Sequence, residues 1–494
     1  MAGGRTSSDW KTWALAVAPF LAIKLWIFLV MPPIGDEAYY WAWSQHPALS
    51  YFDHPPLHAW LLGLVGQVLG WNLYALRALT WLTLAITAWI FWYWARQLSP
   101  DDPKGYFWRS ALLYLASPLF LAMSTIAFQD HLLIALCLAA CHFMVLFAMR
   151  YTAEGRGFRW LYLAALLLGL ATLTKYNAVF VGLAFLAFLL SNRDLRHALR
   201  TPHPWLAALL SVVMQAPVLW WNLSEGFASY RFHLSERWVD PQQASPAQLP
   251  LFLLVSIITL SPLVIWGAIR LFRHRPDTRF ASLAQPLALW LLALSSVAML
   301  GLAFFVRVFF YWNIVGLLLI MPLLALVLRR NWPILAHAAY GLAVGIVLLI
   351  NQTVIPISTL TRGSDWVTET VYGWDEVATR VAALKAEHPR AFVATTAYGT
   401  AGQLGFALRD PDVVALSPRH DQYDFWFQPQ AHAGDDAIII ADELYGIGGS
   451  KGSFAAVELI ETLAIQRFGL TVYRPSIYLA RGYIPPQLSD ESSR

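Results

Sequence analysis

Two short acidic segments near the N-terminus carry the side chains best suited to chemistry. The first is Asp36-Glu37, which aromatic residues follow at once, and the second is Asp53-His54, which two prolines follow. Carboxylates can act as general bases or as ligands of a metal ion. Each segment also has an ordinary explanation, since Asp36 and Glu37 could cap a following helix and Asp53 could lie in a simple turn. The interpretation carried forward is catalytic: Asp36, Glu37 and Asp53.

A second set of polar residues lies at the ends of predicted apolar helices that are far apart in the sequence. Basic side chains bind phosphate and acids transfer protons, so the set predicts a site for an anionic lipid head group. Its members are His54, Asp130, Lys175, Tyr176, Arg237, Arg307 and Tyr311. For any single basic residue the alternative is snorkelling at a membrane interface. We expect Asp36, Asp53, Asp130 and Lys175 to converge on one outward cavity.

Metal binding is a weaker interpretation of the same region. His46, His54 and His58 lie near the acids in sequence, and His54 and His58 have the i, i+4 spacing of a helical ligand pair. Pro55 and Pro56 interrupt that spacing, so a helix beginning at His54 is not expected. We therefore predict no cofactor firmly and keep a divalent metal ion as the less favoured alternative.

The composition places these residues in a membrane protein. Of 494 residues, 58% are hydrophobic and 13% are charged, about half the charged fraction of soluble domains. This excludes a disordered chain, a coiled coil and a nucleic-acid-binding domain, so we expect membrane lipids and no nucleic acid as partners. Two cysteines are too few for a disulfide scaffold or a zinc ribbon.

Eleven segments are apolar and of about the length needed to cross a bilayer as helices. They are 11–31, 73–98, 108–128, 131–150, 159–174, 177–191, 205–222, 251–271, 286–306, 310–328 and 333–355. The apolar stretch 57–70 is shorter and follows two prolines, so we interpret it as an interfacial or re-entrant helix.

The distribution of Lys and Arg orients these spans. With the N-terminus in the cytoplasm, 17 of the 34 basic residues fall in cytoplasmic segments, whereas the first outer loop, 32–56, contains no Lys or Arg. This is the positive-inside pattern, and an odd number of spans then places the C-terminus outside.

The character of the chain changes after about residue 356, where charges mix with short apolar runs. A helix is predicted over 376–388, and strands over 391–396, 437–441 and 470–480. Alternating helix and strand signals indicate a small α/β domain. The predicted organisation is a transmembrane catalytic domain of residues 1–355, whose first outer loop region is 32–72, and an outer α/β domain of residues 356–494.

The loop motifs resemble the bacterial GT-C glycosyltransferases of the protein O-mannosyltransferase and lipid A aminoarabinose transferase group. The resemblance covers nearly the whole chain and rests on residues 36–41, 51–57, 130, 174–176, 311–312 and 422–426. It implies a polytopic α-helical GT-C fold in the bacterial inner membrane with a periplasmic C-terminal domain. It also implies that a sugar passes from a polyprenyl-phosphate donor to an acceptor on the periplasmic face.

The resemblance also implies individual roles. Asp36 matches the acid thought to act on the acceptor hydroxyl or to orient it, Asp53 matches the second acid, and Glu37 matches the paired acid of many mannosyltransferases. Family members often have Lys after the second acid, where this chain has His54. The fixed positive charge on the donor phosphate would then come from a lysine or arginine elsewhere in the list above, Lys175 or Arg307.

The sequence leaves alternatives open for the acceptor and for the class of function. Lipid A, core sugar or another envelope glycan is the expected acceptor, and protein hydroxyls are the alternative. A transporter or flippase of lipid-linked sugars is the alternative from another class. It would place charges near the bilayer midplane on broken helices within inverted repeats, whereas here the charges gather at one face and no repeat is visible.

Overall fold

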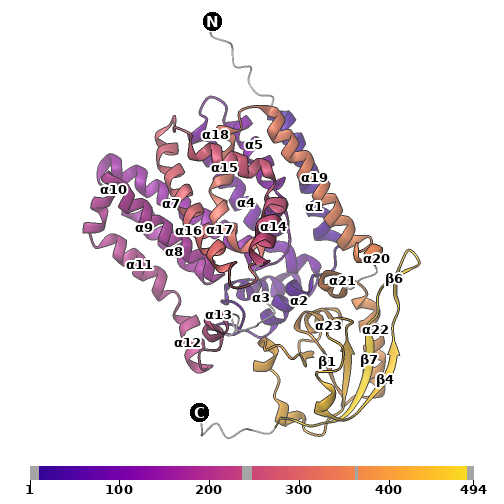
Figure 1. Ribbon diagram of the computed structural model, residues 1–494. Helices are drawn as coiled ribbons and strands as arrows, with labels where there is room; N and C mark the ends of the chain where they lie inside the picture. Colours follow the sequence, from indigo (N-terminus) through magenta and orange to yellow (C-terminus); the bar gives the residue numbers. More distant parts are fainter. Residues whose placement is uncertain (1–9, 236–246, 362–364, 487–494) are drawn as a thin grey trace. The chain divides into compact units, whose positions relative to one another are not determined.

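The computed structural model describes residues 10–235, 247–361 and 365–486 (Figure 1). The chain divides into two compact units. The first unit comprises Met1–Phe28, Leu49–His58 and Arg77–Val347, and the second comprises Leu29–Ala48, Ala59–Leu76 and Leu348–Arg494. Parts of the predicted outer loop region 32–72 thus group with the C-terminal residues. The predicted domain boundary at residue 356 stays a prediction.

Helices make up the described part of the first unit. They include α1 (Trp10–Val30), α4 (Leu73–Leu98), α5 (Pro103–Leu115), α6 (Pro118–Thr125), α7 (Gln129–Glu154), α8 (Phe158–Thr172), η1 (Tyr176–Ala178), α9 (Val179–Ser191), α10 (Arg193–Arg196), η2 (His197–Arg200), α11 (His203–Val213) and α12 (Ala216–Ser224). They continue with α13 (Ala228–Leu234), α14 (Gln248–Leu260), α15 (Pro262–Phe272), α16 (Arg279–Leu302), η4 (Phe310–Asn313), α17 (Ile314–Leu318), α18 (Ile320–Val327) and α19 (Asn331–Thr353).

Among the described residues, five helices are long and apolar enough to cross a membrane, and up to nine spans result if each bent helix pair counts as one. The five are α1, α4, α7, α16 and α19, and the pairs are α9 with α10, α11 with α12, α14 with α15, and α17 with α18. The two other predicted spans correspond to shorter helices, α5 with α6 and the 15-residue α8. The apolar stretch 57–70 forms α3 (Leu57–Leu69), which is short as predicted.

The break between α14 and α15 shows how the sequence bends a span. Helices α14 and α15 meet at 92°. Pro262 opens α15, and Ser261 before it has a positive φ of 77° and accepts a hydrogen bond from the Leu263 N–H at 3.3 Å. Because proline cannot donate to the preceding helical turn, the ladder stops at Leu260. The serine hydroxyl then caps the new helix.

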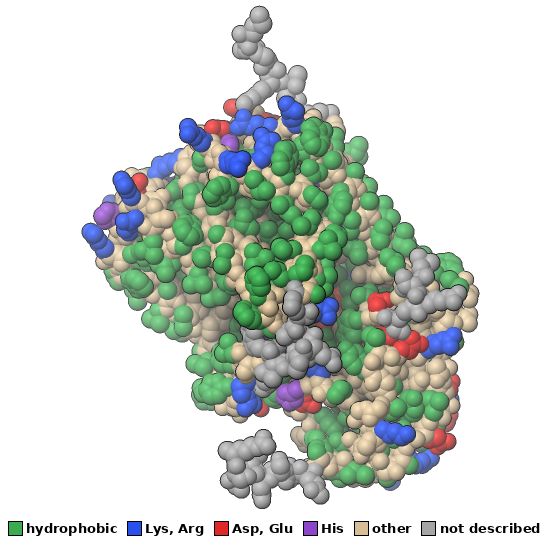
Figure 2. All heavy atoms as spheres, in the orientation of Figure 1, with side chains coloured by type: hydrophobic (Ala, Val, Ile, Leu, Met, Phe, Trp, Pro, Cys, Tyr) green, Lys and Arg blue, Asp and Glu red, His purple; other side chains and the backbone are tan. Residues whose placement is uncertain are grey.

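The surface of the first unit separates apolar and basic side chains. Figure 2 shows hydrophobic side chains over the middle of its visible face and Lys and Arg gathered near α10 and the end of α18. Leu209, Trp220 and Phe305 are more than half exposed, although they are large and apolar. The exposed basic residues include Arg193, Arg196, Arg200, Arg270, Arg273, Arg329 and Arg330. An apolar belt with a basic end is typical of helices that cross a bilayer.

The second unit contains a five-stranded sheet of order β2-β1-β3-β7-β4 (Figure 1). Its strands are β1 (Phe392–Thr395), β2 (Val414–Ala415), β3 (Ala437–Ala441), β4 (Phe454–Thr462) and β7 (Ser476–Tyr483), and β5 (Ile465–Arg467) pairs with β6 (Leu470–Tyr473) in a separate ribbon. Strand β1 is parallel to both β2 and β3, whereas β7 is antiparallel to β3 and β4. The sheet core includes Ala394, Ile439, Phe454 and Tyr483.

Helices of the second unit pack beside this sheet and beside one another. They are α2 (Gly35–Gln45), most of α3, α20 (Ser358–Thr361), α21 (Trp366–Val371), α22 (Trp374–Glu387) and α23 (Tyr398–Leu408), with short turns η5 (Gln422–Phe425), η6 (Pro429–His432) and η7 (Lys451–Ser453). Helix α23 contacts both α22 and α2. The N-terminal helix α2 therefore belongs to the same compact unit as the C-terminal sheet.

Some of the helices and strands predicted for the C-terminal region are present, and one predicted strand is wrong. The strand at 437–441 and the helix near 376–388 are present as β3 and α22. The single strand over 470–480 is wrong, because Pro475 separates β6 from β7 and the two strands join different sheets. Proline lacks the N–H that a continuous ladder needs.

The packing of α19 gives a stability prediction. A Cβ built on Gly341 would lie 1.8 Å from the backbone oxygen of Ala116, so Gly341→Ala forces two backbone segments apart. We expect the free energy of unfolding to fall by about 1–3 kcal/mol, measured as a lower melting temperature in detergent. Gly301→Ala is the matched control, since a Cβ there meets nothing within 4 Å. Equal melting of the two variants would contradict the close approach.

Candidate active site

The firmest polar contact of the first unit joins Lys175 to Asp130. The Lys175 Nζ donates to both carboxylate oxygens of Asp130, at 3.0 and 2.9 Å, and the two side chains are 6% and 1% exposed. Asp130 lies in the first turn of α7, where the helix dipole favours a negative charge. Lys175 lies between α8 and η1 with an extended backbone. The short non-helical turn between α8 and η1 thus places the Lys175 ammonium group at the start of α7.

Aromatic side chains surround this ion pair on one side. The Lys175 Nζ lies 4.8 Å from the centre of the Tyr311 ring, and Asn177 in the same turn donates to the Trp312 carbonyl at 2.7 Å. Contact with the face of an aromatic ring stabilises an ammonium group. Arg307 is exposed, and its guanidinium lies 5.1 Å from the Phe309 ring. Of the two predicted residues in segment 307–311, Tyr311 therefore lies against Lys175, and Arg307 lies against Phe309.

The Asp53 segment lies in the same unit and contacts the same turn. His233 of α13 donates from Nε2 to the Asp53 carbonyl at 2.9 Å, and its ring lies 5.3 Å from that of Tyr176. The His54 ring lies 6.3 Å from that of His233. Asp53 itself is buried at 8% exposure. The first unit thus brings together six of the predicted residues: Asp53, His54, Asp130, Lys175, Tyr176 and Tyr311.

Asp36 and Glu37 belong to the second unit and differ in their surroundings. Asp36 is half-buried, and Tyr398 at the start of α23 donates from its hydroxyl to Asp36 Oδ1 at 3.2 Å. Glu37 is fully buried, and its Oε2 accepts a hydrogen bond from the Ile34 N–H at 3.0 Å. That contact is the capping role that the sequence left open for this pair. Asp36 is therefore the more accessible acid of the two.

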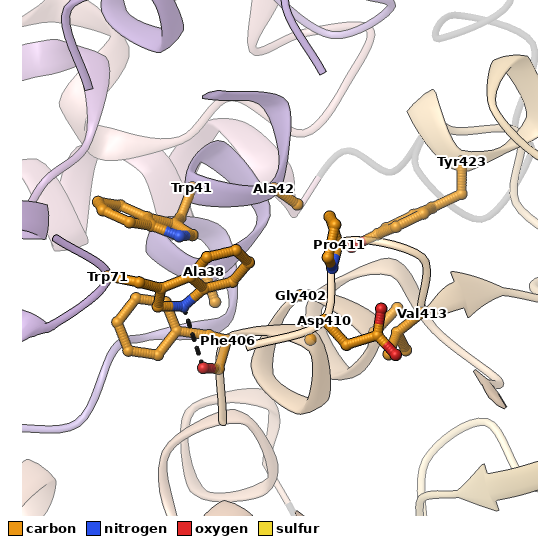
Figure 3. Close-up of a pocket in the computed structure, with 12 residues that line it drawn as sticks. Ala38, Trp41, Ala42, Trp71, Gly402, Phe406, Asp410, Pro411, Val413 and Tyr423 are labelled. Atoms are coloured by element: carbon orange, nitrogen blue, oxygen red, sulfur yellow. Dashed lines mark hydrogen bonds between the residues drawn. The ribbon is translucent and has the colours of Figure 1, made fainter. Parts of the chain in front are cut away.

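Close packing of α2 against α23 fixes the position of Asp36. A Cβ on Gly402 of α23 would lie 2.7 Å from the Tyr39 backbone nitrogen of α2, so only glycine permits this approach. Below it, Trp41 and Trp71 meet Phe406, and the Trp71 indole donates to the Phe406 carbonyl at 3.1 Å (Figure 3). These aromatic side chains border a small hollow of about 10 Å³. The helix that carries Asp36 is thus held by packing rather than by a loop.

Some expectations lie beyond what the structure describes or remain open. Arg237 lies outside the described residues. The expected convergence of Asp36 with Asp53, Asp130 and Lys175 stays a prediction, because Asp36 belongs to a different unit. Among described residues, no group of three or more His, Cys, Asp or Glu side chains has the arrangement of a metal site.

Two functional candidates lack a strong signal in the sequence. Tyr398 contacts Asp36 although 362 positions separate them. His233 lies on α13, and its contact with the Asp53 backbone marks it out. Tyr398 was not predicted from the sequence; its position just after the strand predicted at 391–396 is the cue that could have found it.

Comparison with known proteins agrees with this architecture. Residues 53–221 match the family described as dolichyl-phosphate-mannose-protein mannosyltransferase. Lipid A galacturonosyltransferase RgtD of Rhizobium johnstonii is 26% identical over 387 residues, which cover 76% of this chain and 77% of that protein. ArnT from Cupriavidus metallidurans, solved bound to undecaprenyl phosphate, superposes with a TM-score of 0.64 at 15% identity, covering 96% of this chain and 98% of ArnT.

The chain has the fold of the GT-C membrane glycosyltransferases. The archaeal oligosaccharyltransferase AglB from Archaeoglobus fulgidus shares the fold more distantly, with a TM-score of 0.51 at 12% identity over 88% of this chain and 70% of AglB. The expected fold class, a polytopic helical membrane protein with a small C-terminal α/β region, is confirmed. The chain is a multi-pass membrane protein, as its apolar helices indicate.

The buried ion pair of Lys175 and Asp130 gives a second prediction. Lys175→Met leaves Asp130 buried without its cation, and removing one partner of a buried pair costs about 3–5 kcal/mol. We expect a correspondingly lower melting temperature in detergent. The double variant Lys175→Met with Asp130→Leu should melt above the single variant, because no charge is stranded. A single variant as stable as the parent would show that water reaches the pair.

A third prediction concerns Glu369 of α21, outside the spans. Burial, and then the Asp442 and Glu443 carboxylates, raise the pKa of Glu369 from 4.5 to about 8. The folded protein therefore holds a proton that the unfolded chain loses, so this residue lowers stability as pH rises from about 4.5 to about 8.

Glu369→Gln should flatten the decline of melting temperature over that pH range, because glutamine does not ionise. Glu458→Gln is the control, since Glu458 is exposed on β4. A pH profile that Glu369→Gln leaves unchanged would argue against a protonated Glu369 in the folded protein.

Proposed function

We propose that this protein transfers a sugar from a polyprenyl-phosphate donor to lipid A or another envelope glycan at the periplasmic face of a bacterial inner membrane. The 26% identical relative is a lipid A galacturonosyltransferase, and the ArnT structure of the same fold holds undecaprenyl phosphate. The observation that carries the proposal is the buried cation Lys175 at the end of apolar helices. A lipid phosphate needs this combination of apolar walls and a fixed positive charge.

The chemistry asked of the protein is small, because a sugar on a lipid phosphate is already activated. The acceptor oxygen bonds to the anomeric carbon as the bond from that carbon to the phosphate oxygen breaks. The acceptor loses a proton and the departing phosphate gains negative charge. A carboxylate that receives the proton and a cation that stabilises the phosphate are the essential groups.

Asp36 is the proposed general base. Its carboxylate is half-buried, lies on a helix held by close packing, and accepts a hydrogen bond from Tyr398. Glu37 is proposed to support it by capping α2, since its carboxylate is buried on the Ile34 N–H. Asp53 remains a proposed second acid, held in place through its backbone by His233.

Lys175 is the proposed phosphate ligand, with Asp130 as the residue that positions it. Two of the three ammonium N–H groups are accounted for by the Asp130 oxygens, which leaves one for a phosphate oxygen. Asp130 would repel the phosphate directly, so its role is to hold the cation. Tyr176, Tyr311, Arg307 and His54 are proposed to complete the donor site, together with Arg237.

The orientation is also proposed. The exposed arginines near α10, α15 and α18 form the basic end of the first unit, and basic ends face the cytoplasm. The C-terminal region and the acidic loop would then be periplasmic, where lipid-linked sugars and envelope acceptors meet.

A protein acceptor is the second candidate, because residues 53–221 match a protein mannosyltransferase family. Mass spectrometry of envelope lipids, glycans and proteins from cells with and without the gene separates the two. A sugar lost from lipid A or a glycan supports the main proposal, and a sugar lost only from proteins supports the alternative.

The fourth prediction tests the division of roles. Asp36→Asn should lower transfer by about a hundredfold or more, because the proton has no acceptor, while the Kd for a polyprenyl-phosphate donor stays unchanged. Lys175→Ala should weaken donor binding instead. The measurements are transfer rate with purified protein in nanodiscs and donor binding by calorimetry.

Glu37→Gln is the matched control for Asp36→Asn. Glutamine can keep the capping contact, so transfer should stay within a few-fold of the parent. Near-normal turnover of Asp36→Asn would remove Asp36 as the base, and a large loss in Glu37→Gln would move that role to Glu37. Lys175→Arg, which keeps the charge, separates loss of binding from loss of folding.

A further inference from the structure

Three parallel strands of the second unit end at one edge of the sheet. The chain leaves β1 for β2 on one side and later enters β3 on the other side of β1. The strand order therefore reverses between β1 and β3. In open α/β sheets, ligands bind outside the carboxyl ends of the strands at this reversal point. The segments that follow the three strands carry Tyr398, Arg419 and Asp442.

These segments meet in a patch of aromatic and charged side chains. The Arg419 guanidinium lies 4.5 Å from the centre of the Tyr398 ring. The Trp366 ring lies 5.3 Å from that of Tyr398 and 6.2 Å from that of Tyr445. Arg419 is exposed and Tyr445 is 50% exposed. The patch thus offers solvent an aromatic surface beside a fixed positive charge.

Buried carboxylates lie behind this aromatic surface. Glu369 is 1% exposed and has the Leu444 backbone N–H as a hydrogen-bonding neighbour. Asp442 is 4% exposed, and its Oδ1 accepts a hydrogen bond from the Tyr445 N–H at 2.6 Å, whereas its Oδ2 has no partner among the described residues. Buried polar atoms are normally satisfied. An unsatisfied carboxylate oxygen behind an aromatic surface is suited to a ligand hydroxyl group.

The patch is also connected to the proposed base. Tyr398 is stacked beneath Arg419 and donates its hydroxyl to Asp36 at 3.2 Å. Tyr398 is therefore a common neighbour of Arg419 and Asp36.

We propose that the carboxyl edge of this sheet is a binding subsite for a saccharide bearing an anionic group. Arg419 binds the phosphate or carboxylate, as guanidinium groups do in charge-assisted pairs. The exposed Tyr445 ring and the half-buried Trp366 ring contact the sugar face, and Asp442 accepts hydrogen bonds from hydroxyl groups. The inference rests on the proposed function, because it places the acceptor head group beside Asp36.

The test uses full-length protein in nanodiscs and soluble head-group probes. The probes are a glucosamine disaccharide with and without its two phosphates, and galacturonic acid beside galactose. Binding is measured by saturation-transfer NMR and calorimetry. The phosphorylated disaccharide should bind, and Arg419→Ala should weaken it about tenfold or more, the expected loss of a charge-assisted contact. Arg419→Lys should recover part of the binding, and Tyr445→Ala should weaken both disaccharides.

Arg390→Ala is the matched control. Arg390 is exposed and precedes β1, so it lies at the opposite edge of the sheet from Tyr398. Its loss should change binding less than twofold or so if charge acts locally. Arg419-dependence seen with galacturonic acid and not with the phosphorylated disaccharide would assign the anion to the donor sugar. If every probe binds Arg419→Ala as tightly as it binds the parent protein, the proposed subsite is wrong.

The failure of this inference differs from the failure of the proposed function. Asp36→Asn should keep saccharide binding and lose transfer. If Asp36→Asn loses transfer while Arg419→Ala binds and transfers normally, the subsite is wrong and the function stands. If the parent protein transfers no sugar from a polyprenyl-phosphate donor, the proposed function is wrong, whatever Arg419 does.

Discussion

The buried contact between Lys175 and Asp130 is the constraint on which the first unit depends. An ionised group in an apolar helix bundle is tolerated only with a partner and hydrogen bonds, and the two carboxylate oxygens supply both. The chain must therefore leave helical geometry at Lys175 and return to it at once. The Leu57 N–H bonds to the Leu173 carbonyl at 3.0 Å, so the same turn fixes the start of α3. The turn that carries this ion pair therefore separates α8 from η1 and also contacts the first residue of α3.

In the second unit the equivalent constraint is steric rather than electrostatic. Helices α2 and α23 approach until a Cβ on Gly402 would overlap the α2 backbone, and a Cβ on Gly35 would meet Thr370 at 2.8 Å. Such contact locks the helix that carries Asp36 onto the helix that begins with Tyr398. Sites built on packed helices hold their geometry better than sites on loops. Glu37, the acid next to Asp36, caps the start of α2 through its hydrogen bond from the Ile34 N–H.

The sequence was informative where one physical rule acts alone. Hydropathy located the apolar helices, and the basic residues formed a pattern that agrees with a single basic end. The sequence did not predict the cluster at the sheet edge, because Asp36, Tyr398 and Arg419 meet only in the folded second unit. No periodicity in one segment encodes contacts between segments hundreds of residues apart. Pro475 also shows that alternation alone merges two strands unless proline is weighed.

The surroundings of Asp36 explain how a weak base can suffice. The carboxylate lies in the first turn of α2, beside the positive end of the helix dipole, and accepts a hydrogen bond from the Tyr398 hydroxyl. A donor with a phosphate leaving group asks little of the base, because the acceptor hydroxyl becomes acidic only as its bond to the sugar forms. The carboxylate can then take the proton late, when the transfer is downhill.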